Sequence, residues 1–235
     1  MTVVRWHRLL IAGLLLAAIA RPSASSAQDA APSPDQEPHR IFGLIPNYRT
    51  SPTLQDYHPL GAKETVKMAF ADSLDRGTFA LAAVFAAEAQ LTMAEPSFGT
   101  GVAGYSRYYA ASLTDFVGGD LMTEAVYPVL LRQDPRYFRR GTGNAWPRLG
   151  YAMGQIALTH GDSGSTQFNA SEIAGNATAV AIGNAYYRDN RGLSNSVTKL
   201  GIQLGVDALA NIQREFSPDL ERKFSHSTHA RGVLP

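Results

Sequence analysis

The sequence predicts a mainly α-helical fold, a single compact bundle of about five or six helices behind an extended N-terminal strap. The first supporting observation is the run 78–94, which is rich in Ala, Leu and Phe and carries one charge, Glu88, before Pro96 ends it. A helix that is apolar nearly all round needs burial in protein or in lipid. This run therefore predicts a buried or lipid-covered helix.

Two further observations predict helices in the second half of the chain. Asn169 and Glu172 have the spacing of a capping box, which predicts a helix from Ala170 to about Tyr187. Small residues four apart let helix backbones approach closely. Such residues are Gly150 with Gly154, Gly175 with Ala179 and Gly183, and Gly201 with Gly205.

The remaining helices are predicted from periodicity and from helix stop signals. From Leu60 to Leu74 the sequence predicts an amphipathic helix with Leu60, Val66, Phe70 and Leu74 near one face. The other expected helices and their breaks are a third helical region to Leu131 interrupted at Gly118-Gly119, a helix over 148–159, a loop over 160–168, and a last helix to Phe216 that Ser217-Pro218 stops.

An outer-membrane β-barrel remains an alternative fold. Residues 200–207 alternate apolar with small or polar side chains, and 151–154 repeat the pattern briefly. A barrel needs many alternating segments of about ten residues, and the sequence is short of them. The helical bundle is therefore the favoured prediction.

Composition divides the chain into segments. Basic residues, an apolar run and a small-residue cleavage site are typical of a secretory signal peptide. A Pro-, Ala- and Ser-rich stretch is typical of a disordered linker. The predicted segments are a signal peptide (1–27), a disordered linker (28–40), an extended strap (41–60), a helical domain (61–224) and a loose tail (225–235).

Charge and cysteine content exclude several classes of function. Removal of Arg5, Arg8 and Arg21 with the signal peptide leaves 18 of the 21 basic residues against 20 acidic ones, a net charge of −2. A nucleic-acid binder needs a basic surplus, so no nucleic acid partner is expected. The absence of cysteine excludes disulfides, thiol catalysis and a lipid anchor on a cysteine.

Residues 132–143, RQDPRYFRRGTG, form the densest polar connector in the chain. Guanidinium groups pair well with phosphate or carboxylate oxygens. The candidate anion site consists of Arg132, Arg136, Tyr137, Arg139 and Arg140. The favoured interpretation is structural: Asp134, Asp120 and Glu124 are expected to neutralise these arginines locally.

A second set of polar residues lies among apolar ones in the predicted helices. Three-and-four spacing places several of them on one helix face, where they need hydrogen-bond partners if buried. We expect them to form a structural network between helices. The predicted polar seam consists of Arg107, Tyr108, Asp115, Asp120, Asn176 and Asn184.

The segment 160–164, HGDSG, contains weak catalytic candidates: His160, Asp162 and Ser163. Its GDSG resembles the nucleophile segment of trypsin-like serine proteases, but cysteines and the motif's last glycine are missing. A turn built from Gly, Asp and Ser explains these residues more simply. No HExxH or helical His pair indicates a metal site, and no motif indicates a cofactor.

The segments RIFGLIPNYRT, QDPRYFRRG and FNASEIAGNA, behind a signal peptide, resemble a family of uncharacterised secreted bacterial proteins. That resemblance implies one exported domain and assigns no activity to any residue. The expected function is a non-catalytic structural or lipid- or anion-binding role in the periplasm or at the outer membrane, with anionic lipid or an envelope component as the partner. The alternatives are a periplasmic hydrolase of phosphates or esters and an outer-membrane pore.

Overall fold

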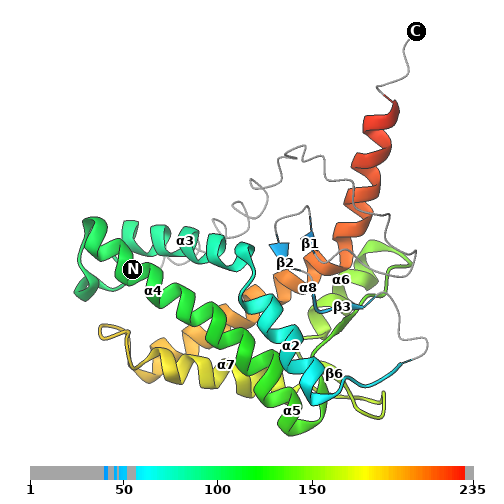
Figure 1. Cartoon of the computed structure of the whole chain (residues 1–235), viewed down its shortest axis with the longest axis horizontal. Helices are drawn as coiled ribbons and strands as arrows, with labels where there is room; N and C mark the ends of the chain where they lie inside the picture. Colours follow the sequence, from blue (N-terminus) through cyan, green and yellow to red (C-terminus); the bar gives the residue numbers. More distant parts are fainter. Residues whose placement is uncertain (1–39, 42–44, 47, 52–56, 231–235) are drawn as a thin grey trace. The chain divides into compact units, whose positions relative to one another are not determined.

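The computed structural model describes residues 40–41, 45–46, 48–51 and 57–230, with side chains for 48–51 and 57–220, and it is mainly helical (Figure 1). This confirms the predicted helical bundle. The predicted signal peptide and all but the last residue of the linker lie outside the described residues.

The helices are α2 (Ala62–Ser73), α3 (Arg76–Leu91), the short 3-10 helix η1 (Pro96–Phe98), α4 (Gly101–Asp120), the π-helical η2 (Leu121–Val126), α5 (Tyr127–Leu131), α6 (Ala145–Gly154), α7 (Ala170–Gly183) and α8 (Leu193–Ala230). The strands are β1 (Arg40–Ile41), β2 (Ile45–Pro46), β3 (Thr50–Ser51), β4 (Gln133–Asp134), β5 (Tyr137–Phe138), β6 (Leu158–Gly161) and β7 (Thr166–Phe168).

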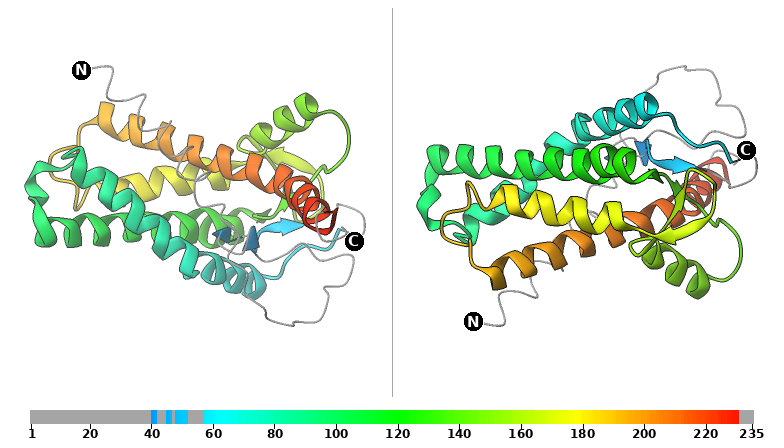
Figure 2. Two further views of the ribbon diagram at one scale, coloured as in Figure 1. Left: turned by 90° about the horizontal axis from the view of Figure 1, so that it is seen from above. Right: turned by 90° about the horizontal axis from the view of Figure 1, so that it is seen from below.

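The long helices α4, α7 and α8 run side by side, and the short strands β3 to β7 gather near one end of them (Figure 2). α3 packs along α4, and α2 packs across η2. Among the described residues, no helix combines the length and the apolar character needed to span a bilayer.

The expected break at Gly118-Gly119 is wrong, because α4, η2 and α5 follow one another without interruption. Helix widening occurs just beyond the glycines, where the backbone N–H of Tyr127 donates to the carbonyl of Met122, five residues back. Pro128 has no N–H to donate to the carbonyl of Glu124, four residues back. The wider π-helical turn before Pro128 accommodates this missing hydrogen bond. The π-helical turn buries Thr123, Glu124 and Ala125 together.

The strap is tied to the arginine connector, residues 132–143, by a short parallel pairing of β3 with β5. The N–H of Tyr137 donates to the carbonyl of Arg49 (2.8 Å), and the N–H of Arg139 donates to Ser51 (3.0 Å). This pairing fixes the backbone from which the Arg49 side chain enters the bundle.

Two element boundaries differ from the sequence prediction. The helix expected over 148–159 ends at Gly154, and the expected loop over 160–168 belongs to the antiparallel sheet β4-β6-β7. β6 pairs with β4 on one side, so a strand there gains hydrogen bonds that the local sequence does not reveal.

The last helix was predicted to stop at Ser217-Pro218, but α8 continues through Pro218 to Ala230. A proline inside a helix leaves carbonyls of the preceding turn in need of other donors. Arg139 Nε and Arg148 Nη2 donate to the carbonyl of Glu215 (2.9 and 2.7 Å), three residues before the proline, and hold this turn from outside the helix. Residues 200–207, whose alternation suggested a strand, also lie within α8.

The α2 helix turns its apolar face outward. Val66, Phe70 and Leu74 are exposed, and Phe70 and Leu74 are 48% and 53% accessible. The buried face instead contains Thr65, Ala69, Asp72 and Ser73. Hydrophobic periodicity therefore identified the apolar face correctly but not which side of the helix faces the protein. We call Val66, Phe70 and Leu74 the α2 apolar face.

Among the described residues, only some of the small residues spaced four apart lie where two helices approach closely. A Cβ built on Gly175 of α7 would lie 2.8 to 2.9 Å from Thr123 in η2, including its backbone. At Gly150, Gly154, Gly201 and Gly205 a Cβ would meet no described atom within 4 Å. The close approach is thus made by α7 against η2.

Candidate functional site

The carboxylate of Glu215 joins the arginine connector to α8 through several hydrogen bonds. Glu215 is fully buried, and its carboxylate accepts hydrogen bonds from Tyr137 Oη (2.9 Å), the backbone N–H groups of Arg140 and Gly141 (3.0 and 2.9 Å), and Arg148 Nε (2.7 Å). Burial and the Glu215 charge raise the pKa of Tyr137, so this phenol remains a donor. The connector therefore has a specific docking point in α8.

The arginines of the candidate anion site are not gathered around one pocket. Arg136 pairs with Asp134 through Nη2 (2.6 Å) and Nε (3.0 Å), and Arg139 pairs with Asp219 (3.0 Å). Arg132 and Arg140 are exposed. The expected partner Asp134 is present for Arg136, whereas Arg139 pairs with Asp219, an acid far away in the sequence, rather than with Asp120 or Glu124.

The interior of the bundle contains five acidic side chains from five different elements, which we call the carboxylate cluster. Its members are Asp72 (α2), Asp120 (α4), Glu124 (η2), Glu172 (α7) and Asp207 (α8). Arg49 and Arg214 are the cations that face this cluster among the described residues. With all five acids ionised, two cations leave the interior three negative charges in excess.

Hydrogen bonding in the carboxylate cluster is incomplete. Arg49 Nη1 donates to Glu124 Oε1 (2.9 Å), and Arg214 Nη2 lies 3.9 Å from Asp72 Oδ2. The second oxygens, Glu124 Oε2 and Asp72 Oδ1, are buried and have no partner among the described residues. Glu124 is 1% and Asp72 5% exposed, so water does not readily reach either carboxylate.

Burial is the first cause that raises the pKa values of Asp120, Glu124 and Glu172 well above their ordinary values, and the neighbouring acids add to it. Burial opposes the charge of Arg49, but Glu124, Glu172 and the other carboxylates outweigh it and raise the pKa of Arg49. Compared with water, the interior therefore favours the charged arginine and the neutral form of these carboxyl groups.

Asn176 links two members of the carboxylate cluster across the α7–α8 contact. Its Nδ2 donates to Glu172 Oε1 (3.1 Å) and to Asp207 Oδ2 (3.0 Å). Glu172 and Asp207 thus face each other around one amide group, and Asp207 is a cause of the raised pKa of Glu172. A hydrogen bond between two carboxyl groups requires a proton on one of them, since an ionised carboxylate only accepts.

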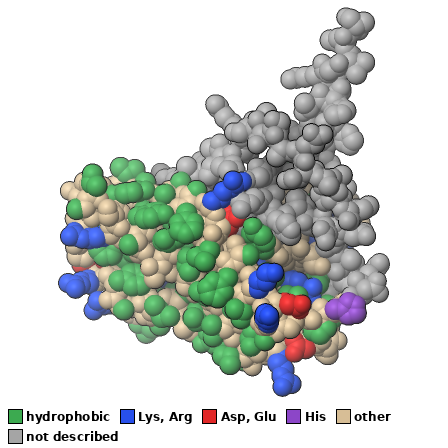
Figure 3. Space-filling model, viewed as in Figure 1, with side chains coloured by type: hydrophobic (Ala, Val, Ile, Leu, Met, Phe, Trp, Pro, Cys, Tyr) green, Lys and Arg blue, Asp and Glu red, His purple; other side chains and the backbone are tan. Residues whose placement is uncertain are grey.

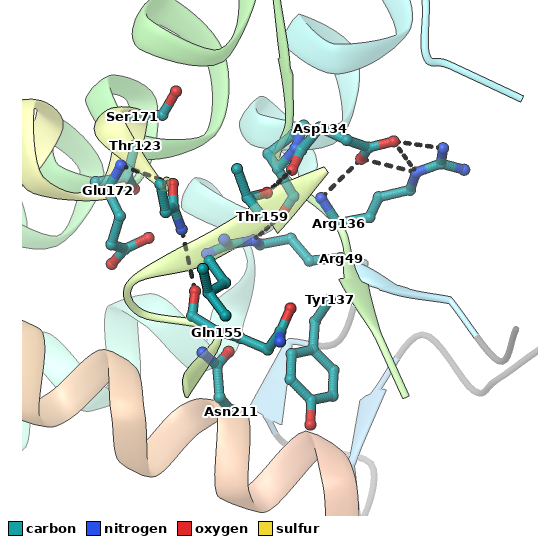
Figure 4. A pocket seen from close by; sticks show the side chains of 13 residues that line it. Arg49, Thr123, Asp134, Arg136, Tyr137, Gln155, Thr159, Ser171, Glu172 and Asn211 are labelled. Atoms are coloured by element: carbon teal, nitrogen blue, oxygen red, sulfur yellow. Dashed lines mark hydrogen bonds and ion pairs between the residues drawn. The ribbon is translucent and has the colours of Figure 1, made fainter. Parts of the chain in front are cut away.

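A polar cavity of about 20 Å³ adjoins this network, which is room for about one water molecule (Figure 4). Arg49 and Glu172 line it, and Asn211 faces it from α8. Asp134 and Arg136 of the arginine connector form another part of its wall. The cavity is thus where the connector and the carboxylate cluster meet.

The predicted polar seam is divided between two places. Asp120 and Asn176 belong to the interior described above. Asp115, nearer the N-terminus of α4, instead accepts hydrogen bonds from the hydroxyls of Tyr186 and Tyr187. Burial raises the pKa of Asp115, and the two tyrosine hydroxyls oppose this effect. Asn176 and Asp115 thus have structural hydrogen-bond partners.

The other seam residues bind backbone or α8. Asn184 donates to Ser196 (2.8 Å) and accepts from Lys199 (3.3 Å), so α7 presents its amides to α8 rather than to α4. Tyr108 donates to the carbonyl of Glu95 (2.7 Å), and the exposed Arg107 donates to that of Phe98 (2.8 Å).

The weak catalytic candidates lie at the β6–β7 hairpin and do not bond to one another through the side-chain contacts described. His160 is buried, with its ring 5.1 Å from that of Phe138, and burial lowers its pKa. Ser163 Oγ bonds to Ser165 Oγ (2.8 Å). Gly164, at φ +76°, provides the left-handed turn.

In the part of the chain that the structure describes, no three His, Asp or Glu side chains are placed to hold a metal ion. The chain matches no family model, no curated protein and no solved structure.

Sequence reasoning missed the residues that make most of these contacts. Glu172 was interpreted as the second half of a capping box, but the N–H of Asn169 donates to the carbonyl of Ala157 and the Glu172 carboxylate turns toward Asn176. Of the two hydrogen bonds of a capping box, only one is present: Asn169 Oδ1 accepts from the Glu172 N–H (3.1 Å). Asp72 lies opposite the α2 apolar face, and its burial follows from the outward orientation of that face, which the sequence does not reveal.

Proposed function

We propose that this protein is a non-catalytic, exported component of the cell envelope, in the periplasm or at the outer membrane, that binds anionic lipid through the α2 apolar face. The observation that carries this proposal is the orientation of α2. Its apolar side chains point outward and its Asp72 points inward.

The area available for lipid contact is substantial. Burying a Phe or Leu side chain contributes about 1.5–3 kcal/mol. On the face viewed in Figure 3, hydrophobic side chains are spread widely with few charges between them. Exposed apolar surface of this kind favours contact with lipid or with another apolar partner.

Charge favours an anionic lipid surface as the partner. Lys63 and Lys67 are exposed on α2 and share its solvent-facing side with Phe70 and Leu74. Helices that lie in a membrane interface combine large apolar residues with lysine or arginine in this way. Each lysine near an anionic surface contributes about 1 kcal/mol.

Vesicle flotation tests the proposal. The full chain is expected to float with phosphatidylglycerol vesicles and to bind phosphatidylcholine vesicles more weakly. Phe70→Ser combined with Leu74→Ser should lower the affinity at least about tenfold, because both side chains lose their apolar contact. Lys63→Glu with Lys67→Glu should remove the preference for the anionic vesicles.

Ala71→Ser is the matched control, since Ala71 is exposed on the same helix and contributes little apolar area. Circular dichroism should be unchanged in every variant, because all of these side chains are at the surface. Equal flotation of the Phe70/Leu74 double variant and the native chain would contradict the proposal, as would a native chain that binds neither vesicle.

A further inference from the structure

The carboxylate cluster has no assigned role in lipid contact, and it contains more buried acid than its cations can neutralise. Glu172 and Asp207 face each other from α7 and α8, with Asn176 Nδ2 donating to both (3.1 and 3.0 Å). Glu172 is 5% and Asn176 3% exposed. Two ionised carboxylates in such an interior would repel each other across the helix contact.

The groups facing this pair come from every element packed around it. Arg49 approaches from the segment before β3, Asp72 from α2, Asp120 from α4, Glu124 from η2 and Arg214 from α8. Arg49 already bonds to Glu124 and to the carbonyl of Pro135 (2.9 Å each). Neither arginine forms a described hydrogen bond or ion pair with Glu172 or Asp207.

A second observation also indicates a missing donor. Glu124 Oε2 and Asp72 Oδ1 are buried acceptors in the same interior, and neither has a partner among the described residues. A buried acceptor without a donor is destabilising. A proton bound to a carboxyl group turns one acceptor oxygen into an O–H donor, so protonation supplies a donor within such a cluster.

We infer that the interior is a proton-binding site in which Glu172 and Asp207 share one proton at neutral pH, and that this proton holds α7 against α8. The proton comes from solvent and forms an O–H bond on one carboxyl group, which donates to the other. Loss of the proton leaves two facing carboxylates and favours separation of the two helices.

The sign of the pH dependence follows from proton counting. The pKa of Glu172 is raised in the folded chain above its ordinary value of 4.5, chiefly by burial and then by Asp207. Between these two pKa values the folded chain binds more protons than the unfolded chain, so stability falls as pH rises. Acidification from pH 8 to pH 5 should therefore raise the melting temperature.

Calorimetric unfolding of the full chain at pH 7, in buffers with different ionisation enthalpies, counts the protons released. The native chain should release protons on unfolding, and Glu172→Gln should release about one fewer. The glutamine amide can donate to Asp207 permanently, so this variant should also show a smaller loss of melting temperature between pH 5 and pH 8. Asp162→Asn, at an exposed turn residue, is the matched control and should behave like the native chain.

Asp207→Asn is the reciprocal variant, in which the amide donates to Glu172, and it should have the same effect. The infrared band of protonated carboxyl groups tests the native chain directly if neither variant folds: it should be present at pH 7. The inference is overturned if that band is missing, or if a folded Glu172→Gln variant releases as many protons as the native chain.

Discussion

Glu215 has a partner for each of its hydrogen-bonding positions, and this distinguishes it from the acids of the carboxylate cluster. Its oxygens accept from Tyr137, Arg148 and two backbone N–H groups, and its carbonyl accepts from Arg139 and Arg148. A buried charge with this many donors is well compensated. Glu215 therefore fixes the arginine connector to α8.

Glu215→Gln should be strongly destabilising, because the new amide N–H groups face donors and leave Arg148 buried beside a neutral side chain. We expect a loss of about 3 kcal/mol in the free energy of unfolding, measured by urea denaturation. Asp219→Asn is the comparison: Asp219 also pairs with Arg139 and Arg148 but is 33% exposed, so we expect about 1 kcal/mol or less. Equal losses would contradict the assignment of Glu215 as the docking point.

At the residue scale, the sequence identified polar positions better than their partners. Asp120 and Asn176 were predicted from helical spacing to lie in a polar seam, and both face the interior network. Glu124 was expected to neutralise the arginine connector but bonds to Arg49 of the strap. Partners that are far apart in the chain depend on strand pairing and helix orientation, which local spacing does not determine.

At the scale of elements, the contact of α7 with η2 depends on Gly175, which has no side chain. Gly175 lies so close to the backbone of Thr123 that a methyl group has no space, and backbone cannot move aside as a flexible side chain can. The π-helical turn brings Glu124 inward at the same place. This close approach therefore positions the carboxylate cluster.

Gly175→Ala should lower the free energy of unfolding by about 1–3 kcal/mol through overpacking. Gly201→Ala is the matched control within a helix that has no described atom near the new Cβ, and it should raise stability by about 0.5–1 kcal/mol. Urea denaturation of both variants measures the difference. A stabilising Gly175→Ala substitution would show that α7 and η2 are farther apart than the structure places them.

Helix propensity and capping predicted several elements because those signals are local. The start of α7 at Ala170 is as predicted from Asn169. The β6 strand and the continuation of α8 past Pro218 were not predicted, since β4 and the guanidinium groups of Arg139 and Arg148 stabilise them from distant parts of the chain. Tertiary contacts outweighed local signals at these points.

At the scale of the whole molecule, polarity is distributed unusually for a helical bundle. Acids, arginines and amides occupy the interior, while large apolar side chains such as Phe70, Leu74 and Leu130 are exposed. An ordinary water-facing bundle places apolar residues inside and charges outside. This arrangement supports the two proposals, a proton-binding interior and a lipid-binding surface.

Spin labelling at one engineered cysteine tests the lipid contact most directly, because the native chain has no cysteine to compete for the label. Ala71→Cys places the label on the exposed side of α2 and keeps Phe70 and Leu74 intact. Asp162→Cys, at the β6–β7 turn, provides a control label away from this helix.

With phosphatidylglycerol vesicles, the label at residue 71 should become shielded from a water-soluble relaxation agent and more accessible to oxygen, which concentrates in the bilayer. The label at residue 162 should remain accessible to the water-soluble agent. If the label at residue 71 has the same accessibility with and without vesicles, the α2 apolar face does not bind lipid and the central proposal is contradicted.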